Sequence, residues 1–256
     1  MNLTPLPAFN DNYIWMFHDG RQAVVVDPGD AAPVQAALDA QGLQLAAILV
    51  THHHPDHVGG VDALRPRLQG PVYGPARENI PAPFEPLLGG AFISVLGLSF
   101  EVIDVPGHTA GHIAYIQRGV ENAPLLFCGD TLFSAGCGRL FEGTPAQMVA
   151  SLARLNALPG GARVCCTHEY TLSNLRFAAA VEPSSAAVAS HTEACQRQRE
   201  AGQPTLPSTL AMEREINPFL RCTEPAVVAA ARAQGARSEE AVEVFAALRE
   251  WKNRYR

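Results

Sequence analysis

Histidine and aspartate side chains are concentrated in one short segment, which runs from His52 to His57. The segment follows the pattern H-x-H-x-D-H, so four side chains that can bind a metal fall within six residues. Imidazoles crowded in this way resist joint protonation, and a bound cation offsets that cost. Imidazole nitrogen and carboxylate oxygen suit zinc, iron or manganese. We therefore interpret the segment as a metal site rather than as a polar loop that happens to be rich in histidine.

Three more side chains of the same kinds occur downstream: His108, Asp130 and His168. Each follows a short apolar run that reads as a strand, just as the first segment follows Ala46–Val50. Strand ends commonly present functional side chains, and converging strand ends can gather them into one site. One four-coordinate metal would not use the whole set, whereas two metals about 3.5–4 Å apart would if a carboxylate bridged them. Because no cysteine takes part and open positions are expected, the set favours hydrolysis over a structural metal site.

The other histidines are expected to have lesser roles. His53 lies between two candidate ligands and should point away from them, and His112 should support a neighbouring ligand. His18 and His191 lie outside every motif and are expected at the surface.

The elements that must position these side chains change in type along the chain. Seven short β-branched or aromatic runs predict strands over Tyr13–Phe17, Ala23–Val26, Ala46–Val50, Phe100–Val105, Ile113–Ile116, Leu125–Cys128 and Arg163–Cys166. Helices are expected after the caps Asp30 and Thr144. After about Tyr170 only helices are predicted, over Leu172–Val181, Ser185–Ala201, Ala226–Ala233 and Glu239–Lys252. We expect a β-rich catalytic domain over residues 1–168 and a smaller helical domain over residues 169–256.

Composition excludes several classes of protein. With 47% hydrophobic and 17% charged residues, the chain can bury a substantial core. A formal net charge of -6 without a block of like charge argues against a nucleic-acid partner. No apolar run is long enough to span a bilayer, and the amino terminus lacks the features of a signal peptide. We expect a cytoplasmic monomer without a membrane partner, whose six cysteines are reduced and mostly buried.

The motif and its three downstream partners resemble the metallo-β-lactamase superfamily. The resemblance implies an αβ/βα sandwich, here followed by a small α-helical C-terminal domain. It also implies two divalent metal ions, zinc foremost, with iron or manganese possible. On this resemblance His52, His54 and His108 would hold one metal, Asp56, His57 and His168 would hold the other, and Asp130 would bridge them.

Longer segments resemble one family within that superfamily, the hydroxyacylglutathione hydrolases, also called glyoxalase II. They are residues 8–13, 129–144, 167–171 and 217–219, so the resemblance covers essentially the whole chain. It implies hydrolysis of S-D-lactoylglutathione to D-lactate and glutathione, the second step of methylglyoxal detoxification. The residues implied in glutathione binding are Arg139, Phe141, Tyr170, Arg249 and Lys252.

Two of these positions depart from the pattern of the animal enzymes. Arg139 stands where a lysine is found and keeps the cation, whereas Phe141 stands where a tyrosine is found and lacks the hydroxyl. Arg249 and Lys252 are three residues apart on a predicted helix, so their charges can converge on one carboxylate. Spacing alone favours a solvated basic helix end, and the family resemblance reverses that preference.

The metals imply the mechanism: water bound between two cations loses a proton near neutral pH and attacks the thioester carbonyl. Asp56 would accept a hydrogen bond from this nucleophile, and a thiolate can leave without a strong general acid. The alternatives are a glutathione persulfide dioxygenase with a single iron, another hydrolase of this fold acting on an ester, lactone or phosphodiester, and a metal-stabilised binding module.

Overall fold

The computed structural model describes residues 1–119 and 123–255, and the chain divides into two compact units. The units alternate along the sequence, so each collects segments that are far apart in the chain. Unit 1 comprises Met1–Asp104, Ala110–Gly129 and Cys165–His168, and unit 2 comprises Val105–Thr109, Asp130–Val164 and Glu169–Arg256. The candidate ligands His108 and Asp130 belong to unit 2, and the other five belong to unit 1.

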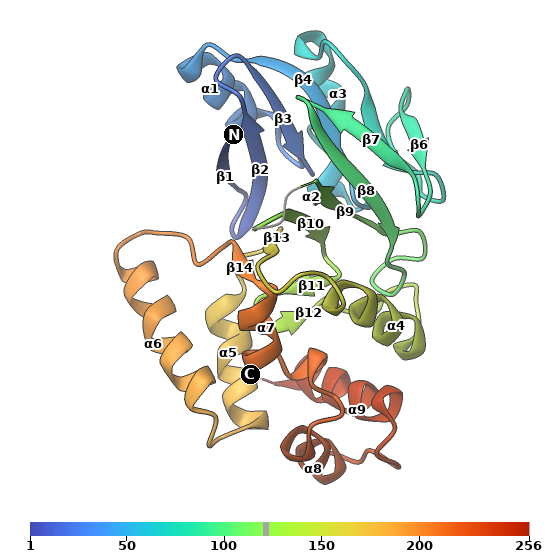
Figure 1. The fold of residues 1–256 in the computed structure, drawn as a ribbon, viewed down its shortest axis with the longest axis vertical. Coiled ribbons are helices and arrows are strands. Elements are labelled where there is room, and N and C mark those ends of the chain that lie inside the picture. The colour runs from blue at the N-terminus through green and yellow to red at the C-terminus, as the bar shows by residue number, and fades with distance from the viewer. Residues whose placement is uncertain (120–122, 256) are drawn as a thin grey trace. The chain divides into compact units, whose positions relative to one another are not determined.

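Unit 1 contains a sheet in which β1 to β6 are adjacent in sequence order (Figure 1). Its strands are Asn2–Ala8 (β1), Asn12–His18 (β2), Gln22–Val26 (β3), Gln44–Leu49 (β4), Val72–Pro75 (β5) and Glu85–Leu87 (β6). β1, β2 and β3 are antiparallel, and the pairs from β3 to β6 are parallel. The short helices Pro55–Val58 (α2), Val61–Leu64 (α3) and Arg65–Arg67 (η1) follow β4.

The longer helix Ala31–Gln41 (α1) packs on this sheet through Val34 and Leu38, which belong to a buried apolar cluster with the strand residues Ile14 and Val25. Asp30 caps the helix because its side chain accepts a hydrogen bond from Ala32 N. The predicted cap is therefore confirmed.

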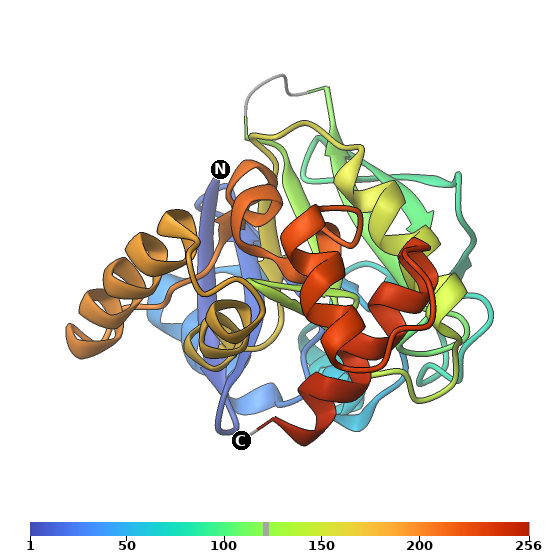
Figure 2. The same cartoon turned by 90° about the horizontal axis from the view of Figure 1, so that it is seen from below.

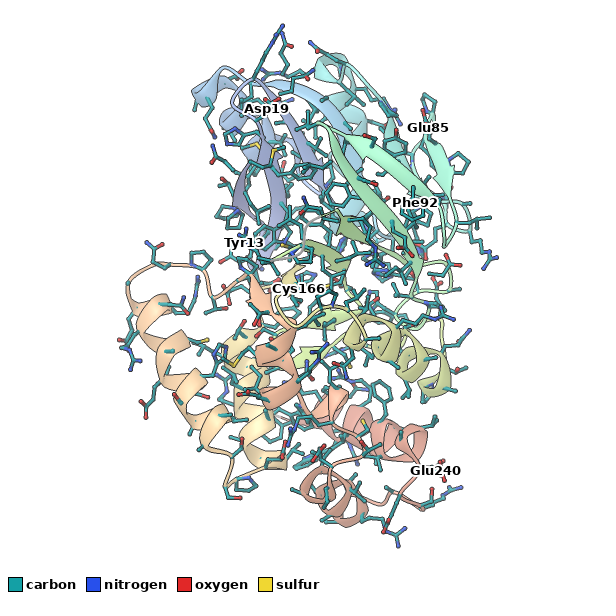
Figure 3. The ribbon with its side chains drawn as sticks, in the orientation of Figure 1. Tyr13, Asp19, Glu85, Phe92, Cys166 and Glu240 are labelled. Atoms are coloured by element: carbon teal, nitrogen blue, oxygen red, sulfur yellow. The ribbon has the colours of Figure 1, made fainter. Side chains whose placement is uncertain are left out.

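A second sheet in unit 1 has the order β13-β10-β9-β8-β7. Its strands are Phe92–Val95 (β7), Leu98–Asp104 (β8), Ile113–Arg118 (β9), Leu125–Gly129 (β10) and the end of Arg163–Cys166 (β13). Figure 3 labels Cys166 on β13 and Phe92 on β7, where the Phe92 side chain is 63% exposed at the edge of the sheet.

The two sheets of unit 1 pack face to face across an aromatic core. The ring of Phe17 on β2 lies 5.7 Å from the rings of both Phe100 on β8 and Phe127 on β10. All three side chains are fully buried. In addition, the indole of Trp15 donates a hydrogen bond of 2.9 Å to Cys166 O. These interactions hold the two sheets of unit 1 together.

Unit 2 is mostly helical (Figure 2). Its helices are Pro145–Asn156 (α4), Thr171–Val181 (α5), Ala186–Glu200 (α6), Leu210–Ile216 (α7), Pro218–Leu220 (η2), Pro225–Ala233 (α8) and Ala241–Arg254 (α9). α5 packs against α6, and α8 packs against α9. Two small pairings complete the unit: the hairpin of Leu132–Phe133 (β11) with Gly136–Cys137 (β12), and Ser208–Thr209 (β14) with the first residues of β13.

The predicted α+β architecture is confirmed: all seven predicted strands and all six predicted helices are present. The elements not predicted from the sequence are α7, the short helices α2, α3, η1 and η2, the strands β1, β5, β6 and β7, and the two-residue strands of unit 2. The prediction that His18 lies at the surface is wrong, because His18 ends β2 opposite Ala23 and is buried.

Candidate active site

The loop after β4 carries four of the five unit 1 ligands, and the single turn of α2 holds two of these four. Pro55 opens this turn, and Asp56 and His57 follow it. One ligand atom from each of Asp56, His57 and His168 lies within 4.8 Å of the others. The Nε2 atoms of His57 and His168 are both 3.5 Å from Asp56 Oδ2. The structure therefore brings together three residues that the sequence analysis assigned to one metal.

The turn before α1 must approach this loop very closely, which requires a glycine. A Cβ atom on Gly29 would lie 1.9 Å from the backbone oxygen of Asp56, so no side chain fits there. This close approach fixes the start of α2 against the end of β3.

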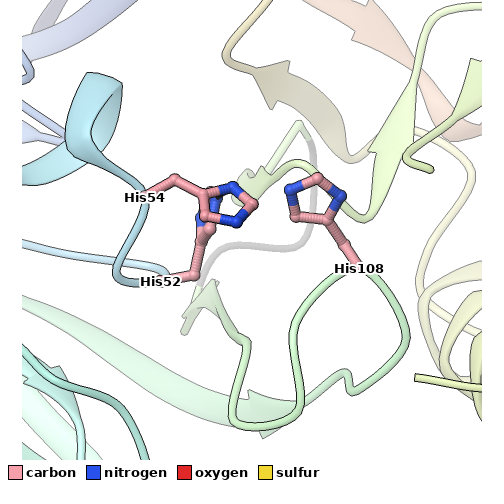
Figure 4. Close-up of side chains that lie close together, drawn as sticks. All are labelled: His52, His54 and His108. Atoms are coloured by element: carbon pink, nitrogen blue, oxygen red, sulfur yellow. Dashed lines mark hydrogen bonds between the residues drawn. The ribbon is translucent and has the colours of Figure 1, made fainter. Parts of the chain in front are cut away.

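His52 and His54 lie side by side in the same loop. His52 Nε2 and His54 Nδ1 are 3.1 Å apart (Figure 4). Figure 4 also draws His108, which unit 2 contributes. The ring of His52 stacks on that of His112, with centroids 4.6 Å apart, and lies 4.0 Å from the ring of His57. Imidazoles packed this closely favour a bound cation over several protonated rings.

Two carboxylates that were not predicted from the sequence lie next to the Nδ1 atoms of the ligand rings His57 and His168. Asp27 Oδ2 is 3.1 Å from His57 Nδ1, and Asp11 Oδ1 is 2.7 Å from His168 Nδ1. A carboxylate on Nδ1 fixes the tautomer that presents the Nε2 lone pair and makes the imidazole a stronger ligand. Both acids are supporting residues of the candidate metal site.

Asp27 also ties this support to the sheet. It is 2% exposed and has a φ of 52°, a left-handed conformation that is uncommon outside glycine. Its carboxylate accepts hydrogen bonds of 2.7 Å from both the backbone nitrogen and the hydroxyl of Thr51. One buried acid therefore holds the exit of β4 and lies within ion-pair distance of the His57 ring.

His53 points away from the ligand group, as predicted. Its backbone nitrogen donates to Glu78 Oε2 at 2.6 Å, and its Nδ1 is 2.7 Å from the same oxygen. Glu78 Oε1 in turn accepts a hydrogen bond of 2.9 Å from Gly111 N, next to His112. Glu78 thus connects the loop of the first motif to the loop that carries His112.

Unit 2 brings its two candidate ligands together. His108 Nε2 is 3.4 Å from Asp130 Oδ2, and its Nδ1 is 2.8 Å from the backbone oxygen of Arg139. That carbonyl accepts from Nδ1 and so again leaves Nε2 for a metal. Gly138 permits the close packing, because a Cβ there would lie 1.9 Å from Asp130 O. The ring of Phe141 meets that of His108 edge-on at 5.3 Å.

A cavity of about 480 Å³ in unit 2 gathers these ligands with every residue that the resemblance implied in substrate binding. It is lined by His108, Asp130, Phe133, Cys137, Arg139, Phe141, Tyr170, Ser173, Asn174, Arg249, Lys252, Asn253 and Tyr255. Its volume falls in the usual range for small-molecule sites, about 300–1,000 Å³. Tyr170 is 37% exposed and meets Phe133 edge-on at 5.4 Å.

The two cations of α9 are held by neutral groups. Arg249 Nη1 donates to Cys137 O at 2.9 Å, and Lys252 Nζ donates to Ser173 O at 3.1 Å. Lys252 Nζ also lies 5.3 Å from the ring centroid of Phe177. Burial, together with the nearby positive charge of Arg249, lowers the pKa of Lys252 to about 8. Within residues 1–119 and 123–255, neither cation forms an ion pair with a carboxylate.

The donor atoms fit divalent transition metals. Each ligand group offers only imidazole nitrogen and carboxylate oxygen, which suits zinc, iron and manganese alike. All six cysteines are buried, which confirms that part of the prediction, and none forms a disulfide in the described part of the chain. No helix in the described part of the chain is long and apolar enough to cross a membrane.

Comparisons with known proteins agree with this assignment. Residues 8–168 match the metallo-beta-lactamase superfamily, and residues 169–255 match the hydroxyacylglutathione hydrolase C-terminus. Hydroxyacylglutathione hydrolases from Albidiferax ferrireducens and Pseudomonas aeruginosa PAO1 are 61% and 56% identical to the chain, and each alignment covers 100% of both proteins.

Two solved structures share the fold. ETHE1 from Myxococcus xanthus aligns with a TM-score of 0.68 and 25% identity, covering 98% of this chain and 90% of that one. TTHA1623 in a di-iron-bound form aligns with a TM-score of 0.60 and 29% identity, covering 85% of this chain and 100% of that one.

Proposed function

The chain belongs to the metallo-β-lactamase superfamily and, within it, to the hydroxyacylglutathione hydrolases, and on that premise we propose its substrate and mechanism. The substrate is an S-(2-hydroxyacyl)glutathione, S-D-lactoylglutathione foremost. The products are glutathione and D-lactate, which makes the reaction the second step of methylglyoxal detoxification. One observation carries the proposal: a single cavity of unit 2 contains two metal-ligand side chains and two cations suited to a substrate carboxylate.

The cofactor proposed is a pair of divalent metals, zinc foremost, with iron or manganese as the other candidates. His52, His54 and His108 would hold one metal, Asp56, His57 and His168 the other, with Asp130 between them. The donor chemistry of the groups within each unit supports this assignment, as does the chain's membership of the superfamily. When bound, the two metals would supply an activated water and polarise the thioester carbonyl.

The remaining roles fall to the chain's own side chains. Asp56 would accept a hydrogen bond from the attacking water, and Asn12 Nδ2, 3.0 Å from Asp56 Oδ2, orients that carboxylate. Asp27 and Asp11 hold His57 and His168 with Nε2 facing the ligand group. The departing glutathione thiolate has a solution pKa of about 8.5, so no strong general acid is needed.

Binding of the glutathione part is assigned to the cavity of unit 2. Arg249 and Lys252 would bind the glycyl carboxylate, an arrangement supported by their burial in a cavity and by partners that leave their charge uncompensated. Tyr170 and Arg139 would contact the tripeptide. Phe141 can offer only packing, because it lacks a hydroxyl.

The organisation of the whole protein completes the proposal. Residues 1–168 would form the catalytic domain and residues 169–256 the glutathione-binding domain. We place the enzyme in the cytoplasm as a monomer, without nucleic acid or a membrane as partner. Six buried free cysteines are consistent with a reducing compartment. The dioxygenase alternative has less support, because relatives 51–61% identical over their full length carry the hydrolase name.

A steady-state assay tests the proposal directly. The purified enzyme is given S-D-lactoylglutathione and, in parallel, the lactoyl thioester of a simple thiol, each before and after chelation. We expect a far higher kcat/KM for the glutathione thioester and loss of activity after chelation. Equal kcat/KM values for the two thioesters, or full activity after exhaustive chelation, would contradict the proposal.

A further inference from the structure

The segment Asn217-Pro218-Phe219 is characteristic of the family resemblance, yet none of its residues has a role in the proposed reaction. It lies in unit 2, where Asn217 joins α7 to η2 and Pro218 and Phe219 begin η2, and all three side chains are buried. Asn217 caps η2 by accepting a hydrogen bond of 3.1 Å from Phe219 N. Its other hydrogen bonds lead to the cavity wall.

Asn217 and Glu213 together hold the β11–β12 hairpin. Asn217 Nδ2 donates to Phe133 O at 3.1 Å, to Gly136 O at 2.9 Å and to Glu213 Oε2 at 3.1 Å. The Glu213 carboxylate accepts from Ser134 Oγ at 2.9 Å and from Ala135 N at 2.7 Å. Two side chains therefore hold the turn of the hairpin: Glu213 of α7 and Asn217 at the end of α7.

This buried carboxylate accepts hydrogen bonds from four donors. Glu213 is 0% exposed, and Ser208 Oγ donates to it in addition to the donors on the hairpin. Burying a charge is costly unless it is fully hydrogen-bonded. Two of the four donors belong to the hairpin, so the hydrogen bonds that satisfy the carboxylate also tie the hairpin to α7.

The hairpin and Phe219 converge on Arg249. The Cys137 carbonyl of β12 accepts from Arg249 Nη1 at 2.9 Å, and the guanidinium carbon lies 5.2 Å from the ring centroid of Phe219. Asn253 Oδ1 accepts from Arg249 Nε at 3.1 Å. Arg249 is only 6% exposed, yet it lines the cavity. The Phe219 ring therefore contacts one face of the Arg249 guanidinium, and the Cys137 carbonyl contacts its edge.

We propose that Glu213, Asn217 and Phe219 are positioning residues that hold the Arg249 guanidinium in the orientation required to bind a substrate carboxylate. The inference rests on the proposed function, in which Arg249 binds that carboxylate. A guanidinium binds a carboxylate best when its planar fork meets both oxygens, so its orientation is part of its affinity. A fork fixed before the substrate arrives loses less side-chain freedom on binding.

A double-mutant cycle tests the link between Phe219 and Arg249. The variants are Phe219→Leu, Arg249→Met and the two combined, with KM and kcat measured for S-D-lactoylglutathione. Phe219→Met serves as a second version, since its flexible side chain fills the core if leucine prevents folding. Phe100→Leu, in the core of unit 1, is the control for a general loss of stability.

If Phe219 acts through Arg249, Phe219→Leu should raise KM roughly 3- to 10-fold with kcat changed less than about twofold. The same substitution should leave KM unchanged in the Arg249→Met background. The control Phe100→Leu should lower the melting temperature without changing KM. An unchanged KM in both Phe219 variants, or an equal rise in both backgrounds, would overturn the inference.

The cycle also separates this inference from the proposed function. If Arg249→Met leaves KM unchanged, the assignment of Arg249 to the carboxylate fails, and the positioning role fails with it. If Arg249→Met raises KM but the Phe219 variants do not, only the positioning inference fails.

Rescue by a conservative variant tests Glu213. In Glu213→Gln the amide oxygen can accept from Ala135 N and Asn217 while the amide nitrogen donates to the serine hydroxyls. We expect this variant to keep the wild-type KM and Glu213→Leu to raise KM as Phe219→Leu does. A wild-type KM in folded Glu213→Leu would refute a role for the carboxylate, as would a raised KM in Glu213→Gln.

Discussion

Alkaline pH should weaken substrate binding through the charge on Lys252. Burial and neighbouring arginines lower the pKa of its ammonium to about 8, well below the usual value for lysine. The group is therefore a cation below about pH 8 and becomes neutral above it. At about pH 9.5 roughly 3% of the free enzyme keeps the charge, against nearly all of it at about pH 6.5.

The loss can be sized from the hydrogen bond that the charge would make. A hydrogen bond to a charged group is worth about 1.5–3 kcal/mol, and each 1.4 kcal/mol is about tenfold in affinity. Lys252 keeps part of its solvent exposure, so we expect the lower part of this range. The expected fall in kcat/KM is roughly tenfold between about pH 6.5 and about pH 9.5. The effect belongs in kcat/KM because that ratio reports groups titrating in the free enzyme.

Lys252→Arg provides the matched control for the assay. Arginine stays charged throughout this range, so the substitution keeps the cation and removes its titration. Any other group that titrates in this range would do so in both proteins and would cancel in the ratio of their kcat/KM values. That ratio, wild type over Lys252→Arg, should fall with an apparent pKa near 8. A ratio that stays flat across the range would refute both the lowered pKa and the role of Lys252 on the carboxylate.

Three other outcomes are expected. Asp11→Asn should weaken metal binding roughly 10- to 100-fold in a chelator competition, because the Asp11 carboxylate lies 2.7 Å from His168 Nδ1 and supports that ring. The control is Asp62→Asn, at an exposed position. An unchanged metal affinity in Asp11→Asn would refute the supporting role of Asp11. Metal analysis should approach two equivalents, and Asp130→Ala should abolish thioesterase activity; one firm equivalent after reconstitution, or an active variant, would contradict a bridging carboxylate. Phe141→Tyr should lower KM roughly 2- to 10-fold by restoring a hydroxyl at the cavity, whereas a higher KM would show that the ring position serves packing alone.

The candidate ligands could be predicted from the sequence because residue type and spacing carry that information locally. Four ligands fall in the segment after β4, and each of the others lies within four residues of the end of a strand. The acids that support them could not be found in this way. Asp11 is 157 residues from His168 along the chain, and only the folded sheets bring the two together. Neither Asp11 nor Asp27 differs in sequence from an ordinary turn residue.

Most of the missed elements are short, and β1, which has seven residues, contains two prolines that obscure its strand pattern. α7 has seven residues and β6 has three, so neither is long enough to display a helical or strand period. Their positions depend on tertiary interactions, such as the Glu213 carboxylate that ties α7 to the β11–β12 hairpin. Helix α7 therefore escaped prediction although it carries the residue that fixes the cavity wall.

The charge of the group that supports each site residue agrees with the charge of the ligand that the residue is proposed to bind. His57 and His168 are supported by carboxylates, whose negative charge strengthens an imidazole toward a cation. Arg249 and Lys252 are instead supported by backbone carbonyls and aromatic faces. A carboxylate partner would have neutralised these cations and competed with the substrate, whereas neutral partners hold them in place and leave the charge available. The lowered pKa of Lys252 is the expected consequence, since a buried cation without an anionic partner binds its proton less tightly until a carboxylate arrives.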